Sequence, residues 1–386
     1  MNCVRLGIIG VGNMGWGHAE KILSGNVNRC QITAVCDPSP EKFPRFPNAK
    51  GFTRSDELIR SGLVDAVLIA TPHYDHTTIG IDTLQHGLHM LVEKPISVHK
   101  ADAERLIAAH KGPKQIFAAM FNQRTDPYYR KLRALIQSGE LGPVRRINWT
   151  ITNWFRPDAY YKLGAWRATW AGEGGGVLLN QCPHNLDLFQ WLFGMPKRVR
   201  GFCQFGRYHD IEVEDDVTAY FEYADGTTAS FITSTGEAPG TNRLEVAADN
   251  GRLVLENETL VFTKNETPAS EFSRTSTKPF SVPATTESKF TFPDHGGQHI
   301  EVLQNFIDAI LDGKPLIAPA SEGLGSVELA NAILFSSAHN DTVDLPLDSA
   351  AYATFLEQKS ATSRFRKNAP RKHGTLTDDL ANSFHR

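Results

Sequence analysis

A glycine motif near the start of the chain constrains its fold more than any other feature. The pattern G-x-G-x-x-G at residues 10–15 follows an apolar run at 4–10 and opens a helical pattern at 14–23. In such a strand–turn–helix, the first glycine permits a tight turn, the second lets backbone approach a pyrophosphate, and the third lets helix and strand pack closely. The helix N-terminus adds unpaired N–H groups and partial positive charge. The motif therefore predicts a dinucleotide site formed by Gly10, Gly12, Asn13, Met14 and Gly15.

Short apolar runs alternate with helical patterns throughout residues 1–122. This alternation is typical of βαβ units and a parallel sheet. Several of the apolar runs lack polar alternation, as expected where helices cover both faces of the sheet. We therefore predict a doubly wound α/β domain whose strands lie near residues 4–10, 31–36, 66–70, 90–93 and 115–119.

The pattern changes after residue 122 to longer, alternating strands separated by hairpin signals. Asp225-Gly226 and Asn250-Gly251 are dipeptides that favour two-residue hairpin turns. Helical patterns at 176–193, 298–311 and 322–338 are expected on one face of the resulting sheet, leaving the other face to solvent or another subunit. We predict an α+β domain with a large, open, mostly antiparallel sheet. Its expected parts are residues 123–362, including a long loop at 265–294, followed by a polar basic tail at 363–386.

Composition agrees with a two-domain globular protein that binds a small molecule. The chain has 386 residues, and a single core usually stops growing beyond about 250–300. A formal net charge of −3 gives no bulk attraction to nucleic acid or anionic lipid. No run is apolar enough to cross a bilayer, and no secretion signal precedes the first apolar run. We therefore expect a cytoplasmic protein without a nucleic-acid or membrane partner.

Cysteine and histidine spacings do not indicate a metal site. The five cysteines are scattered and form no C-x-x-C pair. His73 and His76, and His295 and His299, have spacings that suit metal ligands, but no cysteine or carboxylate cluster completes either set. We predict no bound metal.

Asp37 indicates which dinucleotide is bound. It closes the second predicted strand, 22 residues after Gly15, where a carboxylate can accept hydrogen bonds from the adenosine ribose hydroxyls. The carboxylate would repel a 2′-phosphate, and residues 38–41 supply no arginine to neutralise one. We predict NAD rather than NADP as the cofactor. The alternative is that Asp37-Pro38 only starts a turn.

Three further segments lie where a substrate site is expected. Thr71-Pro72 and Glu93-Lys94-Pro95 each follow a predicted strand, and residues 174–187 read GGGVLLNQCPHNLD. Together with the glycine motif, Asn122-Gln123-Arg124 and Trp166-Arg167, they resemble the glucose-fructose oxidoreductase and inositol 2-dehydrogenase family over residues 4 to about 340. The resemblance implies a Rossmann domain followed by an α+β domain whose open sheet forms subunit contacts, in a homodimer or homotetramer.

The resemblance also implies the roles of individual residues. It places Lys94 and His184 at the reacting hydroxyl of a sugar or polyol substrate. The implied cofactor contacts, besides the glycine motif and Asp37, are Thr71, Pro72, His76, Glu93, Lys94 and Asn122. The implied substrate contacts are Lys94, Arg124, Trp166, Arg167, Asn180 and His184.

The chemistry explains why an amine and an imidazole belong together here. When hydride leaves a secondary alcohol carbon, the hydroxyl proton must leave too, and a neutral amine or imidazole within hydrogen-bond reach can accept it. Histidine has an ordinary pKa near ~6.5, whereas the pKa of lysine, near ~10.4, must be lowered by burial or nearby positive charge. We therefore expect His184 to accept the proton and Lys94 to orient the hydroxyl.

One position departs from a common pattern of the family. Many members carry aspartate where this chain has Asn180, whose amide can still donate and accept a hydrogen bond. The segment 174–187 is more similar to members that oxidise the C3 hydroxyl of hexopyranosides, so we expect that substrate class. Three alternatives stay open: inositol 2-dehydrogenase, a glycosidase that oxidises C3 transiently before elimination, and a cofactor-binding regulator without turnover.

Overall fold

The computed structural model describes residues 2–164 and 166–364, and the predicted tail lies outside this range except for its first two residues. Within the described residues, the amino-terminal sheet has six parallel strands in the order β3-β2-β1-β4-β5-β6. The strands are β1 (Val4–Ile9), β2 (Cys30–Cys36), β3 (Lys50–Phe52), β4 (Ala66–Ile69), β5 (His89–Val92) and β6 (Phe117–Ala119). This is the doubly wound order in which dinucleotides bind at the switch point between β1 and β4.

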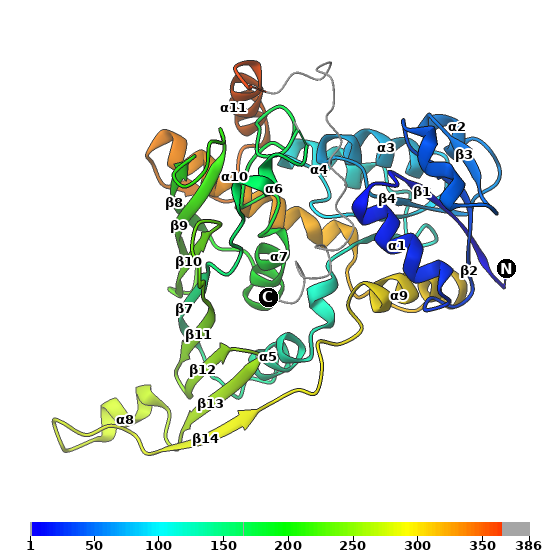
Figure 1. Cartoon of the computed structure of the whole chain (residues 1–386). Coiled ribbons are helices and arrows are strands. Elements are labelled where there is room, and N and C mark those ends of the chain that lie inside the picture. Colours follow the sequence, from blue (N-terminus) through cyan, green and yellow to red (C-terminus); the bar gives the residue numbers. More distant parts are fainter. Residues whose placement is uncertain (1, 165, 365–386) are drawn as a thin grey trace.

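Helices cover both faces of this sheet, which explains its continuous apolar strands. All four residues of β4 are buried. The helical elements of this half are α1 (Asn13–Leu23), η1 (Pro40–Arg45), α2 (Ser55–Ile59), α3 (His73–Gln85), α4 (Lys100–Ala108) and η2 (Asn122–Thr125). A later helix, α9 (Gln298–Asp312), returns to this sheet, and its Val302, Phe306 and Ile307 join the core beside β1 (Figure 1).

The second sheet has nine strands among the described residues, in the order β14-β13-β12-β11-β7-β10-β9-β8-β15. All neighbouring pairs are antiparallel except β7 and β10. The strands are β7 (Val144–Ile151), β8 (Arg198–Phe205), β9 (Glu214–Glu222), β10 (Thr228–Ser234), β11 (Asn242–Ala248), β12 (Gly251–Glu256), β13 (Thr259–Asn265), β14 (Thr285–Phe290) and β15 (Val343–Asp344). The predicted fold class is confirmed, as are the hairpin turns at Asp225-Gly226 and Asn250-Gly251.

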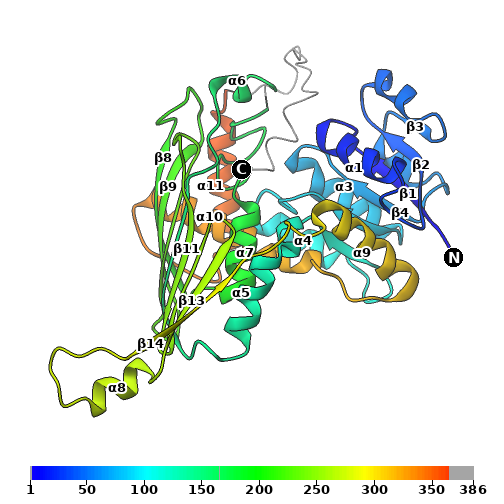
Figure 2. The same ribbon diagram turned by 60° about the horizontal axis from the view of Figure 1, so that its bottom comes forward.

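Helices cover only the face of this sheet that is turned toward the Rossmann sheet (Figure 2). Leu186 and Phe189 of α7 pack with Phe221 and Phe231 of the sheet in one core. The opposite face carries exposed aromatic side chains, including Phe202 and Tyr220. The helical elements of this half are α5 (Pro127–Gln137), α6 (Asp158–Tyr161), α7 (Pro183–Phe193), α8 (Ala269–Thr275), η3 (Ala320–Glu322), α10 (Gly323–His339) and α11 (Ser349–Ala361).

Two segments differ from the sequence-based expectation. The predicted helix at 176–193 begins only at Pro183, because the preceding glycine run bonds to the main chain and carboxylate of Glu214 instead of forming helix. The predicted loop at 265–294 contains α8 and the edge strand β14, which pairs with β13. Figures 1 and 2 show α8 projecting beyond the end of the sheet.

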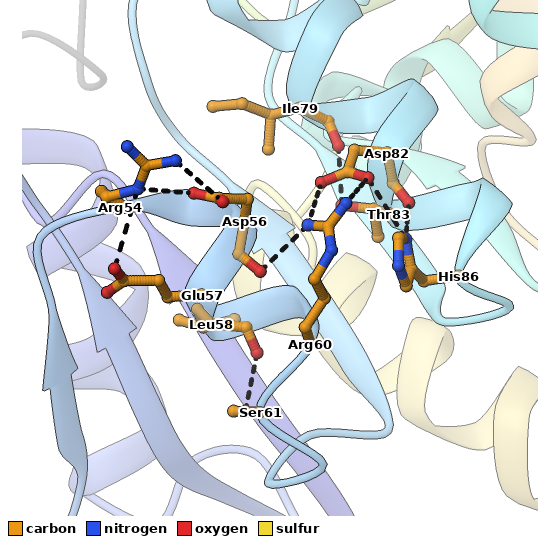
Figure 3. A network of polar contacts seen from close by, with 10 residues as sticks. All are labelled: Arg54, Asp56, Glu57, Leu58, Arg60, Ser61, Ile79, Asp82, Thr83 and His86. Atoms are coloured by element: carbon orange, nitrogen blue, oxygen red, sulfur yellow. Dashed lines mark hydrogen bonds and ion pairs between the residues drawn. The ribbon is translucent and has the colours of Figure 1, made fainter.

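A surface network ties α2 to α3 on the Rossmann half (Figure 3). Arg60 donates to both carboxylate oxygens of Asp82 at 3.0 Å and to the main-chain oxygen of Asp56 at 3.1 Å. His86 contacts the same carboxylate at 3.2 Å. These groups are exposed to water, so they fix the register of the two helices while contributing little to stability.

Two features that would indicate membrane or metal binding are absent from residues 2–164 and 166–364. No helix in the described ranges is both long and apolar enough to span a membrane. No group of three or more His, Cys, Asp or Glu side chains that could hold a metal ion occurs there either.

Candidate active site

The carboxyl ends of four Rossmann strands bring the predicted segments to one edge of the sheet. The glycine turn follows β1, Thr71-Pro72 follows β4, Glu93-Lys94 follows β5, and Asn122 lies shortly after β6. Ligands of doubly wound sheets bind at this edge. The helix-covered face of the second sheet, with α7 on it, is turned toward the Rossmann half (Figure 2).

The glycine turn has the shape that a pyrophosphate requires. Gly10 has φ +86°, and a Cβ there would lie 2.6 Å from the oxygen of Ala70, so only glycine fits. A Cβ on Gly15 would lie 1.9 Å from the oxygen of Gly10. A Cβ on Gly12, by contrast, would meet no atom within 4 Å. Gly12 and Asn13 are exposed at the start of α1, which has no side-chain cap. The main-chain N–H groups at the start of α1, and the open space beside Gly12, fit a dinucleotide phosphate.

Several buried polar atoms on the predicted site segments have no protein partner. They include Oγ1 of Thr71 and Oδ1 of Asn122 on the Rossmann half, and Nδ1 of His184 on α7. The Nδ2 atom of Asn122 donates to Gln298 at 2.5 Å, which fixes the amide with its oxygen free. Unpaired buried polar groups are costly in a finished core and are expected where a ligand completes the bonding. The residues present therefore fit the cofactor that the sequence predicts.

Asp37 lies at the end of β2 and is almost completely buried. Its carboxylate accepts hydrogen bonds from the main-chain nitrogens of Val11 and Ser39, at 3.1 and 3.0 Å. Lys42 also contacts it, at 2.8 and 2.9 Å from the two oxygens. The sequence-based prediction took only residues 38–41 as neighbours of Asp37 and did not include Lys42. The 3₁₀ helix η1 places Lys42 against the carboxylate. A positive charge therefore lies beside the predicted ribose site.

Glu93 is a buried carboxylate that anchors the strand end before Lys94. Its Oε1 lies 2.6 Å from Nε2 of His18 on α1, and its Oε2 accepts the main-chain N–H of Lys94 at 3.1 Å. Burial raises the pKa of Glu93, but the bond to His18 and nearby positive charge outweigh burial and bring the pKa to about 2. Glu93 is therefore ionised at neutral pH and fixes the peptide that carries Lys94.

The side chain of Lys94 crosses to the second domain. Its Nζ donates to the main-chain oxygen of Asn180 at 2.9 Å. His184 lies four residues later in the chain, near the start of α7, and is buried. Burial lowers the pKa of Lys94, and Glu93 and Glu173 offset part of that effect. Burial and the charge of Lys94 lower the pKa of His184 well below its ordinary value, so the imidazole is neutral at neutral pH.

The glycine run before α7 allows the backbone at Asn180 to take this position. A Cβ on Gly176 would lie 1.9 Å from the main-chain oxygen of Glu214. The carboxylate of Glu214 accepts the N–H groups of Gly176, at 2.8 Å, and Leu178, at 3.0 Å. Burial raises the pKa of Glu214 to about 7. The glycine run therefore packs closely against Glu214 and supports the segment that leads to His184.

Polar and aromatic side chains surround Asn180 on the second domain. Tyr160 donates to Oδ1 of Asn180 at 3.1 Å and accepts from Arg167 at 2.8 Å. The guanidinium of Arg167 also lies over the ring of Trp166, 4.7 Å from its centroid. The buried Glu173, which accepts from the side chain of Asn180, was not among the predicted site residues.

Two predicted site residues have their polar atoms taken up by other groups of the protein. Both ring nitrogens of His76 are taken up by main-chain oxygens, Pro95 at 2.8 Å and Thr71 at 2.9 Å, so His76 joins the two loops instead of contacting a ligand directly. Arg124 is buried in ion pairs with Asp187, at 2.6 and 2.7 Å, and with Glu322. Its donors are consumed by these carboxylates, and this placement does not favour the predicted contact with substrate.

Comparison with known families and proteins agrees with this arrangement. Residues 4–121 match the family described as an oxidoreductase family with an NAD-binding Rossmann fold, and residues 129–254 match the GFO/IDH/MocA C-terminal domain. The chain belongs to the Gfo/Idh/MocA oxidoreductase family. Its first domain is the NAD-binding Rossmann domain of that family.

Individual relatives are distant in sequence. Inositol 2-dehydrogenase of Corynebacterium glutamicum strain R is 29% identical over 199 residues, which cover 50% of this chain and only 54% of that protein. Inositol 2-dehydrogenase of Rhizobium meliloti is 26% identical over 352 residues, or 89% of this chain and 99% of that protein. The WlbA dehydrogenase of Chromobacterium violaceum, solved with NADH and UDP-GlcNAcA, is 24% identical with a TM-score of 0.76 and covers 90% and 97% of the two chains. That structure shows the shared fold.

Proposed function

We propose that this chain is an NAD-dependent dehydrogenase that oxidises a secondary alcohol of a sugar or polyol. The observation that carries the proposal is the hydrogen bond from Nζ of Lys94, on the Rossmann half, to the main-chain oxygen of Asn180, four residues before His184. It joins the end of β5 to the segment that opens α7, in a region where buried polar atoms lack partners. Membership of the oxidoreductase family supports the same reaction type.

The residues suit the two transfers that such an oxidation needs. Bound NAD⁺ supplies the hydride acceptor. Lys94 donates a hydrogen bond to the reacting hydroxyl oxygen and holds it toward His184, whose neutral imidazole accepts the hydroxyl proton. The low pKa of His184 keeps this acceptor available at neutral pH. In the reverse direction, the protonated imidazole returns the proton to the carbonyl oxygen.

The substrate that we favour is a hexopyranoside oxidised at C3. Asn180 supports this choice because it replaces the acidic residue common in the family with a neutral amide. Trp166 and Tyr160 lie near the same segment, where Arg167 covers one face of each ring, and the ring C–H faces of sugars pack well on aromatic surfaces. In this proposal residues 123–362 bind substrate, and Arg167 and Asn180 contact it.

A turnover experiment distinguishes this function from the other candidates. Purified protein is incubated with NAD and a panel of pyranosides, aryl glycosides and inositols, while NADH absorbance and aglycone release are followed together. Stoichiometric NADH from pyranosides supports the proposal, and NADH from inositols alone assigns an inositol 2-dehydrogenase. Aglycone release without net NADH assigns the NAD-assisted glycosidase. No turnover of any compound in either direction contradicts the proposal and favours a regulator.

The open face of the second sheet supports a homo-oligomer. Phe202 on β8 and Tyr220 on β9 point to the same uncovered face, with 53% and 42% of their surfaces exposed. Exposed aromatic patches on a broad sheet are typical of protein interfaces. We propose that two copies pack these faces together, as a homodimer or as part of a homotetramer.

A further inference from the structure

A buried glutamate lies directly behind the proposed site and has no role assigned to it above. Glu173 immediately precedes the glycine run and is only 1% exposed. Its Oε2 accepts the main-chain N–H of Ala168 at 2.6 Å, and its Oε1 accepts the side-chain amide of Asn180. Burial raises the pKa of Glu173, while Arg167 and these two hydrogen bonds stabilise the ionised form and oppose that rise. Glu173, Asn180, Tyr160 and Gln181 line one small cavity.

Arg167 sets the direction of the hydrogen bonds around the side chain of Asn180. A guanidinium can only donate, so the Tyr160 hydroxyl accepts from Arg167 and donates to the oxygen of Asn180, and the amide nitrogen of Asn180 faces Glu173. The hydroxyl of Tyr160 then donates to Asn180 and accepts from Arg167 at 2.8 Å and from Gln181 at 3.3 Å. The chain of donors and acceptors is consistent throughout, which holds residue 180 in one orientation.

Residue 180 in turn holds Lys94. The main-chain oxygen of Asn180 accepts Nζ of Lys94 at 2.9 Å, while its side chain is held by Glu173. Other charged or titratable groups also face Glu173: Arg167 on the same segment, Glu214 across the glycine run, and His73 at the start of α3. Lys94, the proposed hydroxyl-orienting group, also interacts with the charge of Glu173, and Asn180 bonds to both residues. Glu173 therefore connects to the reaction through Asn180.

We infer that Glu173 is a positioning residue that supplies, from seven residues earlier in the chain, the active-site carboxylate that Asn180 lacks. It fixes the amide of Asn180 and, through that residue, the ammonium group of Lys94. The inference deepens the proposed function and rests on it. In this chain the amide stands at position 180 and a carboxylate lies behind it.

The test measures the titration of Lys94 directly. Labelling of Lys94 by acetic anhydride is followed by mass spectrometry against pH in the wild type and in Glu173→Gln, Asn180→Asp and the double variant. Burial lowers the pKa of Lys94 and the charge of Glu173 raises it. Glu173→Gln is therefore expected to shift the labelling midpoint down by about one pH unit and kcat down by about tenfold or more. Asn180→Asp alone sets two carboxylates together and lowers kcat.

The double variant again has one carboxylate and one amide at these positions, now with the amide at 173 and the carboxylate at 180. It should therefore recover the wild-type Lys94 midpoint and raise kcat at least tenfold above that of Glu173→Gln. Glu214→Gln is the matched control, because it removes a buried carboxylate that holds the same glycine run but not Asn180. It is expected to lower the melting temperature without moving the Lys94 midpoint. The inference is overturned if Glu173→Gln leaves the midpoint unchanged, or if Glu214→Gln moves it equally.

Two further outcomes are a Glu173→Gln variant that does not fold and a wild-type protein without turnover. If Glu173→Gln does not fold, the double variant is compared with the wild type: a retained Lys94 midpoint supports the inference, and a midpoint about one unit lower overturns it. Labelling requires no turnover. A wild-type protein that oxidises no sugar therefore counts against the proposed function, while the Lys94 titration still decides the role of Glu173.

Discussion

Nζ of Lys42 lies 2.8 and 2.9 Å from the two carboxylate oxygens of Asp37, at the predicted ribose site. Lys42 is 29% exposed, so its side chain can leave the carboxylate when a ligand hydroxyl takes its place. The pair carries two opposing preferences. Asp37 repels a 2′-phosphate, whereas Lys42 attracts one. We expect the balance between these two side chains to set the preference between NAD and NADP.

Asp37→Asn is expected to weaken NAD binding by about tenfold, because ribose hydroxyls lose a charged acceptor. It should also narrow the preference for NAD over NADP, since Lys42 then attracts the 2′-phosphate without opposition. Lys42→Ala should change the preference in the opposite direction. Dissociation constants for NADH and NADPH from fluorescence titration measure both effects. Equal NAD-to-NADP ratios in the wild type and both variants would show that Asp37 does not face the ribose.

The sequence predicted the parts of the site that local patterns determine. The turn of Gly10 and Gly15 is fixed by contacts within one strand–turn–helix, and Lys94 lies at a strand end that the apolar pattern marks. Lys42 was missed because a 3₁₀ helix returns it to Asp37, and short helices of this kind have no clear periodicity. Glu173 directly precedes the glycine run, and that position was the available signal.

Contacts between distant segments were not readable from the sequence. Arg124 follows a Rossmann strand and was expected at the substrate, yet its guanidinium pairs with Asp187, 63 residues away, and with Glu322. The residues that neighbour Arg124 in the sequence do not indicate these partners. The helix predicted at 176–193 likewise begins late because Glu214, on a neighbouring strand, takes up the N–H groups of the glycine run.

Lys94→Ala and His184→Ala are each expected to lower kcat by about 10²-fold or more, since one removes the hydroxyl-orienting group and the other the proton acceptor. NAD binding should be largely intact in both variants. Steady-state kinetics and NADH titration measure the two properties separately. Lys114→Ala and His86→Ala are matched controls on the exposed Rossmann surface, and both should turn over normally. Normal turnover of Lys94→Ala and His184→Ala would refute the assignment of both residues.

Phe202→Glu should shift the protein toward monomers, because it places a charge in the proposed sheet-to-sheet contact. Tyr220→Glu, on the neighbouring strand, should do the same. Light scattering coupled to gel filtration gives the molar mass. Leu23→Glu is the matched control: Leu23 is 54% exposed on α1 of the Rossmann half, so its substitution should leave the mass unchanged. A monomeric wild type, or variants with the wild-type mass, would contradict this interface.

The lowered pKa of His299 leads us to expect that the folded state loses stability in acid. Burial and the neighbouring His18 lower its pKa to about 3, whereas an unfolded histidine titrates near ~6.5. The unfolded chain therefore binds the proton first as pH falls, and stability decreases between about pH 6.5 and the folded pKa.

Over the interval from pH 6.5 to pH 5, this single group should cost about 2 kcal/mol of unfolding free energy. His299→Gln cannot titrate, so its stability should fall less steeply over that interval. Urea unfolding of both proteins at pH 7, 6 and 5 gives the comparison. His339→Gln is the control, because His339 is exposed at the end of α10 and its loss should leave the slope unchanged. Parallel slopes for His299→Gln and the wild type would show that His299 is protonated in the folded protein at pH 5.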